Sequence, residues 1–205
     1  MAKTPSQMLP LGTLAPGFSL PDADGKMHAL DDAAGSRAFV IMFICNHCPF
    51  VKHVADELAR LGRNYEDKGV AVFAINSNDV ENYPADGPEK MKQEATSRGY
   101  TVPYLLDRDQ GVAKAYQAAC TPDFYLFGAD RTLVYRGQPD GSRPGNQTAG
   151  TGAPRRTARA AGPAGDTLPA EQLPSGACNN TCTAGTAPAL FGYMCPGAPP
   201  PATIL

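Results

Sequence analysis

The hydrophobic pattern of the first two thirds of the chain alternates between strands and helices. Continuous apolar runs at residues 38–44 and 70–75 predict two strands that are buried on both faces, as in a parallel sheet. Between them, residues 49–67 carry apolar side chains at helical spacing and stop at Gly69, a common helix end. This order of strand, helix and strand predicts an α/β domain whose sheet is covered by helices.

Shorter elements complete the predicted domain. An N-terminal hairpin is expected at residues 18–20 and 27–30, and a closing hairpin at residues 124–127 and 132–135. Between them, helices are expected at residues 88–98 and 111–119, and an extended segment at residues 104–106. The hairpins are indicated by turn residues between short apolar runs. Because the crossovers favour parallel pairing and the closing hairpin is antiparallel, we expect a central mixed β-sheet flanked by helices.

Composition changes sharply near Arg136. Residues 137–205 contain 11 glycines and 11 prolines among 69 residues, and no valine. A segment so poor in core-forming residues is not expected to pack as a second domain. We therefore expect one domain over residues 10–147 and an irregular, low-complexity, disordered tail over residues 148–205.

Part of this tail raises a question about its origin. Residues 152–162 have no apolar stripe, yet one possible GC-rich coding of them, read one base later, gives an amphipathic helix with leucines at helical spacing. A pair of compensating frameshifts and a natural low-complexity linker both remain open. As written, Pro154 and the glycines predict no long helix, and Cys178, Cys182 and Cys195 are then incidental thiols.

Charge and hydropathy exclude several classes of function. The net charge is −2 and there is no basic block, so no nucleic-acid partner is expected. No apolar run approaches the roughly 20 residues of a membrane span, and the N-terminus lacks the apolar run of a signal peptide. We therefore expect no membrane partner and a cytoplasmic location, where most thiols are kept reduced.

Cys45 and Cys48 carry the clearest chemical signal in the sequence. They follow the apolar run at residues 38–44 and stand at the start of the predicted helix. A helix N-terminus offers unpaired amide donors and a positive dipole end, which favour a thiolate, the nucleophile of disulfide exchange. The two-residue spacing allows the sulfurs to close a disulfide. A strand, a Cys-x-x-Cys motif and a helix together predict a redox-active dithiol.

Other interpretations of this pair stay open. A structural zinc site needs two more Cys or His ligands; His53 has no evident partner, and Cys178 and Cys182 would serve only if the tail folded back. A structural disulfide is disfavoured in a chain without an export signal. A redox switch without turnover and a carrier of a soft metal are the remaining alternatives to an enzyme. We expect no cofactor and no resident metal.

A second signal lies at Thr121-Pro122, just before the predicted strand at 124–127. Proline tolerates a cis bond, and a cis bond turns the preceding backbone outward, where an extended substrate can pair with it. An ordinary proline at a strand start is the alternative. With the dithiol upstream, we expect a cis Thr121–Pro122 bond beside it. Cys120 is either a third redox thiol or, more commonly for a free cysteine, a small buried apolar residue.

Six segments of the chain resemble the thioredoxin-like superfamily, in particular the peroxiredoxin-like proteins of its redoxin (AhpC/TSA-type) branch. They are Ala15–Phe18, Phe43–Val51, Ala74–Asp79, Tyr83–Asp86, Cys120–Phe124 and Tyr135–Gln138. The resemblance implies a thioredoxin-like fold over about residues 10–147. It also implies a thiol-disulfide oxidoreductase in redox homeostasis or antioxidant defence. Its substrates would be protein or small-molecule disulfides, and its electron donor the thioredoxin or glutathione system.

The sequence also departs from the branch. Thioredoxins have Trp before the first Cys and Gly-Pro within the motif; this chain has Ile44, Asn46 and His47 there. Peroxiredoxins place Pro and Thr seven and three residues before the peroxidatic Cys. Counted back from Cys48, these two positions hold Ile41 and Cys45. Counted back from Cys45, they hold Ala38 and Met42. Efficient peroxidase activity is therefore not expected.

Roles within the motif follow from its placement. Cys45, at the end of the strand, is expected to expose its sulfur and attack; Cys48, inside the first helical turn, is expected to be more buried and to resolve the mixed disulfide. His47 either stabilises the Cys45 thiolate when protonated or is an exposed loop residue. Residues 76–79, at the end of the second strand, either line a substrate groove or form a polar turn.

Overall fold

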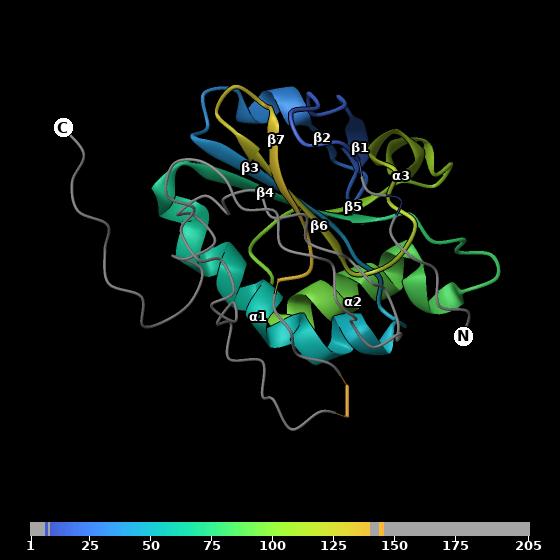
Figure 1. The fold of residues 1–205 in the computed structure, drawn as a ribbon. Coiled ribbons are helices and arrows are strands. Elements are labelled where there is room, and N and C mark those ends of the chain that lie inside the picture. Colours follow the sequence, from blue (N-terminus) through green and yellow to red (C-terminus); the bar gives the residue numbers. More distant parts are fainter. Residues whose placement is uncertain (1–6, 8, 140–143, 146–205) are drawn as a thin grey trace.

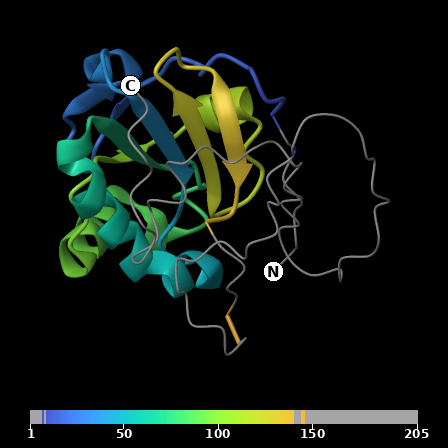
Figure 2. The same ribbon diagram turned by 60° about the vertical axis from the view of Figure 1, so that its left-hand side comes forward.

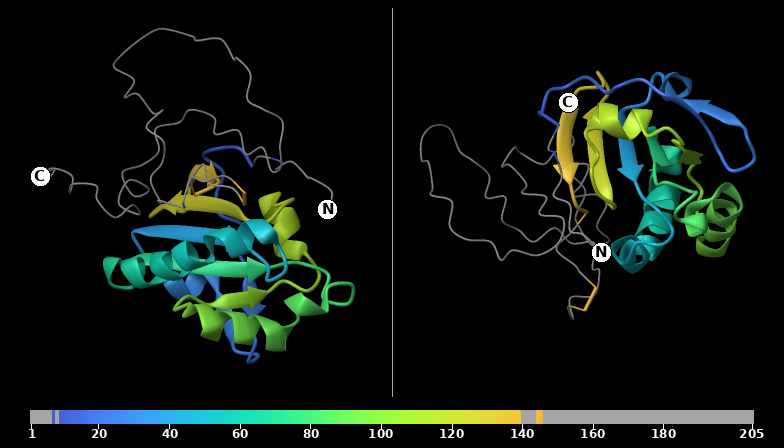
Figure 3. Two further views of the ribbon diagram at one scale, coloured as in Figure 1. Left: turned by 90° about the horizontal axis from the view of Figure 1, so that it is seen from below. Right: turned by 90° about the vertical axis from the view of Figure 1, so that its right-hand side faces the viewer.

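A five-stranded mixed sheet forms the centre of the fold. The computed structural model describes residue 7, residues 9–139 and residues 144–145. The strands are β3 (Ala38–Phe43), β4 (Val70–Asn76), β5 (Tyr104–Leu106), β6 (Asp123–Gly128) and β7 (Leu133–Gly137), in the order β5-β4-β3-β6-β7. β3 and β5 are parallel to β4, whereas β6 is antiparallel to β3 and β7 (Figure 3, left).

The central strand β3 is buried along its whole length. Successive side chains of a strand point to opposite faces of the sheet. Val40 and Met42 accordingly belong to the core on one face, and Phe39, Ile41 and Phe43 to the core on the other. Because both faces are covered, the strand is a continuous apolar run, as the sequence predicted.

Two long helices cover one face of the sheet (Figure 1). They are α1 (Pro49–Tyr65) and α2 (Pro88–Arg98), which contribute Leu58 and Met91 to the core beneath them. Residues 66–68 continue α1 only as a 3-10 turn, η2 (Glu66–Lys68). Gly69 and Gly99 then end the helical segments at φ 68° and 66°, in the left-handed region that favours glycine.

The opposite face is covered by shorter elements (Figures 1 and 2). These are the hairpin of β1 (Ser19–Pro21) and β2 (Met27–Ala29), the 3-10 turn η1 (Leu30–Ala33), and α3 (Gly111–Tyr116). The sequence predicted that α3 would continue to residue 119. The helix ends earlier because Gln117 adopts a left-handed conformation with φ 54°. Tyr116 fixes this layer, since its hydroxyl donates to the carbonyl of Pro16 at 2.8 Å.

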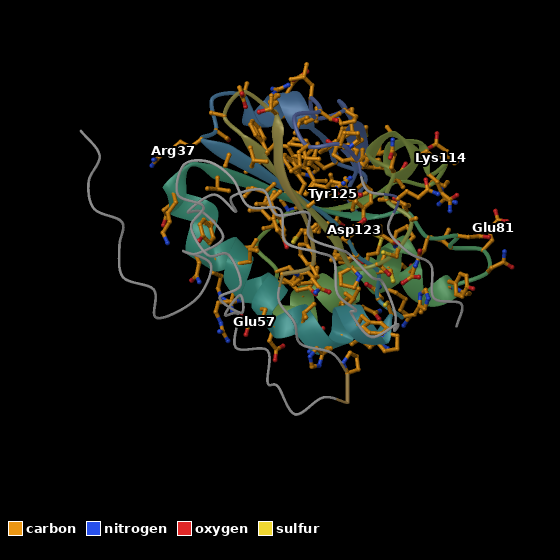
Figure 4. The ribbon with its side chains drawn as sticks, viewed as in Figure 1. Arg37, Glu57, Glu81, Lys114, Asp123 and Tyr125 are labelled. Carbon is orange, nitrogen blue, oxygen red and sulfur yellow. The ribbon has the colours of Figure 1, made fainter. Side chains whose placement is uncertain are left out.

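The α/β fold class, the mixed sheet and the N-terminal hairpin are confirmed. Charged side chains such as Arg37, Glu81 and Lys114 lie on the outside, whereas Asp123 and Tyr125 of β6 are buried (Figure 4). Among the described residues, no helix has the length and apolarity needed to cross a bilayer. The predicted domain boundary at 147, the tail over 148–205, the segment 152–162 and the three tail cysteines lie outside the described residues.

Candidate functional site

The dithiol lies where the chain passes from β3 into α1. Cys48 is the residue that precedes α1, and Pro49, whose fixed φ suits a first helical position, begins the helix. Both cysteines are free thiols. Cys45 is 1% exposed and Cys48 is 7% exposed, so the expectation of an exposed Cys45 and a more buried Cys48 is wrong. The helix starts only after Cys48, which leaves Cys45 in the core at the strand end.

Thr121 contacts both sulfurs. Its hydroxyl Oγ1 lies 3.2 Å from Cys45 Sγ, and its carbonyl oxygen lies 3.3 Å from Cys48 Sγ, whose thiol donates to it when protonated. The Thr121–Pro122 bond is cis. β6 is antiparallel to β3, with Asp123 opposite Phe43, and this pairing brings the loop to the dithiol. The prediction of a cis bond beside the motif is confirmed.

The two sulfurs share one proton unevenly. The pKa of Cys48 is lowered to about 5, first by a hydrogen bond from the Cys45 thiol and then by the Val51 amide, the Thr121 hydroxyl and the Phe50 amide, against burial. The same hydrogen bond, burial and the nearby Asp86 carboxylate raise the pKa of Cys45, and Thr121 opposes them. At neutral pH the pair therefore holds one negative charge, favoured on Cys48 beside the helix amides.

Asp86 stands behind the motif; the sequence placed it in the family-like segment Tyr83–Asp86 but assigned it no role. It ends the 3-10 turn η3 (Pro84–Asp86) and is fully buried. Its Oδ1 accepts the backbone N–H of Asn46 at 2.7 Å and that of His47 at 3.3 Å. Its Oδ2 lies 2.5 Å from the Nδ1 atom of the His47 ring. One carboxylate thus binds the main chain and the imidazole between the two cysteines.

Polar residues after β4 hold Asp86 in place. The side-chain amide of Asn76 donates to the Asp86 carbonyl at 2.8 Å, and that of Asn78 donates to Oδ2 at 2.9 Å. Tyr104 donates to Oδ1 of Asn46 at 3.0 Å, which fixes the motif from the β5 side. Of the two interpretations of residues 76–79, the structure supports the structural one for Asn76 and Asn78, since both bind Asp86.

His47 is held from two sides. Its ring contacts Asp86 and stacks in parallel on Tyr83, with centroids 4.7 Å apart and an interplanar angle of 4°. Its side chain is 29% exposed, so the interpretation as a freely exposed loop residue is wrong. Polar atoms of Cys45, His47 and Asp86 lie within 4.8 Å of one another, which also makes them a candidate ligand set for a metal ion.

Cys120 lies on the other side of the cis bond. It is half-buried and lies within electrostatic reach of the Tyr125 phenol. Tyr125 in turn donates its hydroxyl to Asp123 Oδ2 at 2.9 Å. Both interpretations of Cys120, as a third redox thiol or as a small apolar packing residue, stay predictions.

Comparison with known proteins supports the same class of fold and chemistry. A solved structure of an uncharacterized conserved protein from Geobacillus kaustophilus is 57% identical, with a TM-score of 0.71 over 74% of this chain and 81% of that chain. A putative peroxiredoxin of Mycobacterium tuberculosis H37Rv is 33% identical over 56% of this chain and 68% of its own length. The thiol-disulfide oxidoreductase ResA of Geobacillus thermodenitrificans is 29% identical over 57% of this chain and 63% of its own.

More distant structures show the fold alone. A thioredoxin domain from Bacteroides vulgatus has a TM-score of 0.53 at 19% identity, covering 63% of this chain and 89% of that domain. The thioredoxin-like fold is therefore confirmed, and the names of the relatives confirm the prediction of an oxidoreductase. Residues 11–136, more than half of the chain, match the model of the AhpC/TSA family. The chain belongs to the AhpC/TSA family, on the redoxin branch of the thioredoxin-like fold.

Proposed function

We propose that this chain is a thiol-disulfide oxidoreductase that works through Cys45 and Cys48. The observation that carries the proposal is a pair of free thiols at a helix start, one of which has its pKa lowered to about 5. A thiolate at neutral pH is the reactive species in disulfide exchange. The Thr121–Pro122 loop beside the sulfurs adds a backbone edge against which an extended substrate can lie.

In the proposed reaction the Cys48 thiolate attacks one sulfur of a substrate disulfide. A Cys48–substrate disulfide forms, and the other substrate sulfur leaves as a thiolate. Cys45 then loses its proton and attacks Cys48, which closes the Cys45–Cys48 disulfide and releases the second substrate thiolate. Two electrons pass from the dithiol to the substrate, and the two thiolates take up protons. This order reverses the one expected from sequence, because the helix amides face Cys48.

The wider setting is part of the proposal. The electron donor is expected to be a thioredoxin or glutathione system, and the location cytoplasmic. The role is expected to be redox homeostasis or antioxidant defence through thiols rather than through rapid peroxide reduction. A peroxiredoxin has Pro seven residues and Thr three residues before its reactive cysteine. This chain has Ile41 seven residues before Cys48 and Met42 three residues before Cys45.

Turnover of an added disulfide tests the proposal. Reduction of insulin, or of a small disulfide coupled to glutathione, is measured for the native chain, Cys45→Ser, Cys48→Ser and the control Cys120→Ser. We expect either motif substitution to reduce turnover at least about 100-fold, since each removes one sulfur of the two-step exchange. Cys120→Ser should retain most activity. Equal activity in all four proteins would contradict a dithiol enzyme.

The order of attack is tested by trapping. Cys45→Ser should accumulate a mixed disulfide through Cys48 with an excess of substrate disulfide, because no resolving thiol is left. Cys48→Ser should form its mixed disulfide more slowly, because burial and the Asp86 carboxylate still raise the pKa of the remaining Cys45 thiol after the Cys48 hydrogen bond is lost. Faster trapping through Cys45, seen by peptide mapping, would restore the order expected from sequence.

Metal binding is a second candidate function. It is favoured by the closeness of Cys45, His47 and Asp86. Thiolate and imidazole suit zinc or copper. A metal there would have to replace hydrogen bonds that Asp86 already accepts from His47 and Asn78, so the dithiol enzyme is preferred. Metal analysis of protein purified under reducing conditions tests this candidate; stoichiometric zinc or copper lost in Cys45→Ser would support it.

A further inference from the structure

Asp86 is a fully buried carboxylate that binds the segment between the two cysteines. A buried carboxylate must be satisfied by hydrogen bonds, and Asp86 is fully buried with donors on both oxygens. Two of these donors are the main-chain amides of Asn46 and His47, between the two cysteines. One carboxylate oxygen also lies within 4.8 Å of the Cys45 sulfur.

We propose that Asp86 is the positioning residue of the dithiol: it fixes the Cys45–Cys48 segment from behind and directs the shared negative charge away from Cys45 and onto Cys48. This inference rests on the proposed dithiol chemistry and adds a residue to it. Asp86 acts through the sulfurs and does not touch the substrate.

Electrostatics gives the charge a direction. A fixed negative charge within 4.8 Å of Cys45 Sγ repels a thiolate there. At an effective dielectric constant of about 20 this repulsion is large enough to change a pKa by more than about one unit. Cys48 instead lies beside the amides of Val51 and Phe50, and Asp86 is not among the main influences on its pKa.

The other ionisable groups near Cys45 do not replace this effect. Burial raises the pKa of Tyr104, so its phenol stays neutral. His47 contacts Asp86 directly, and when protonated it offsets part of the carboxylate charge.

The test measures each thiol alone in the full chain. Cys120 and the tail cysteines Cys178, Cys182 and Cys195 are replaced by Ser. Cys45 is then titrated in the Cys48→Ser background and Cys48 in the Cys45→Ser background, by thiolate ultraviolet absorbance and by the pH dependence of alkylation. Asp86→Asn is added to each, because Asn removes the charge and keeps an oxygen for the two main-chain amides.

We expect Asp86→Asn to lower the Cys45 pKa by about one unit or more, which is a tenfold gain in thiolate below that pKa. The Cys48 pKa should change so little that its thiolate fraction changes by less than about threefold. Asp107→Asn is the matched control, since Asp107 is also fully buried and accepts two main-chain amides. It should leave both titrations unchanged.

Several results would overturn the proposal. These are no change in Cys45, an equal change in both thiols, or the same change with Asp107→Asn. If Asp86→Asn fails to fold, Asp86→Ser decides, since it also removes the charge: a lowered Cys45 pKa supports the proposal, and an unchanged or raised one contradicts it. The titrations need no turnover, so they remain readable if the chain reduces no disulfide. A failed proposed function and a failed role for Asp86 are thus distinguishable.

Discussion

Asp86 and Asp107 are two buried carboxylates at the same edge of the sheet, and the use that the fold makes of them differs. Asp107 directly follows β5 and accepts the amides of Val112 and Ala113, near the start of α3. Asp86 ends the loop after β4 and accepts two amides of the Cys-x-x-Cys segment. Both satisfy main-chain donors that would otherwise be buried and unpaired.

The difference lies in what those donors belong to. The amides bound by Asp107 belong to a helix, whose own hydrogen bonds contribute to its geometry. The amides bound by Asp86 belong to a short segment between two thiols that precedes α1. The carboxylate therefore fixes the shape of the segment and adds a charge beside the reactive sulfurs. A buried carboxylate that accepts main-chain amides therefore changes the chemistry of the site only where its charge lies beside an ionisable group.

The largest expected effect comes from removing each carboxylate entirely. Asp86→Ala leaves two amides and an imidazole without their acceptor, and we expect a loss of about 3 kcal/mol in the free energy of unfolding. Asp107→Ala should lower the free energy of unfolding by about 2 kcal/mol. It leaves two backbone amides of α3 and the Ser77 hydroxyl without the carboxylate that accepts their hydrogen bonds. Urea unfolding measures both.

The comparison predicts that only the first change alters the dithiol. Alkylation of Cys45 and Cys48 in each folded variant provides the second readout. If Asp107→Ala changed thiol reactivity as much as Asp86→Ala does, the two carboxylates would act only through general loosening of the sheet edge.

The next effect is a pH dependence of the stability of the reduced protein, which comes from Cys45 and Cys48. Cys48 has its pKa lowered to about 5 from an ordinary value of 9.0. Between these values the unfolded chain binds one more proton than the folded chain, so the reduced protein gains stability as pH rises from about 5 to 9. Above 9.0 the raised pKa of Cys45 reverses the sign, because the folded chain then keeps a proton that the unfolded chain has lost.

Urea midpoints of the reduced chain across this range measure the dependence. The dithiol contribution should be lost as pH falls toward 5, and the oxidised protein and Cys48→Ser should show flatter curves. Parallel curves for all three proteins would mean that Cys48 is not ionised in the folded state.

A smaller effect is expected on the opposite side of the sulfurs. Thr121 lowers the pKa of both cysteines through its hydroxyl. Thr121→Val should therefore slow alkylation of Cys48 near pH 5 by up to about fivefold, the worth of roughly one hydrogen bond. Thr121→Ser keeps the hydroxyl and should behave like the native chain. A slower rate in both variants would assign the effect to packing.

The sequence was sufficient for what depends on periodicity and covalent geometry. The apolar runs of β3 and β4, the glycine at the end of the α1 region, the dithiol and the Thr121–Pro122 bond all followed from local residues. Asp86 did not, because a single acidic residue in a polar loop gives no local sign that it will be buried 40 residues from the amides it binds. The exposure of Cys45 and Cys48 was also mispredicted, since it depends on where the helix begins.

The smallest expected effect concerns Tyr83, which precedes η3 and brings an aromatic ring to the same imidazole that Asp86 binds. The ring is 50% exposed, so little burial is lost on its removal. Tyr83→Ala should cost about 1 kcal/mol or less, the worth of a stacked pair, and Tyr83→Phe should be neutral because it keeps the ring. If Asp86 alone fixes His47, Tyr83→Ala leaves the alkylation rates of both thiols unchanged. A change near that of Asp86→Asn would instead make the stacked ring an equal partner in holding the segment, and the contrast with Asp107 would then lie in the whole loop after β4.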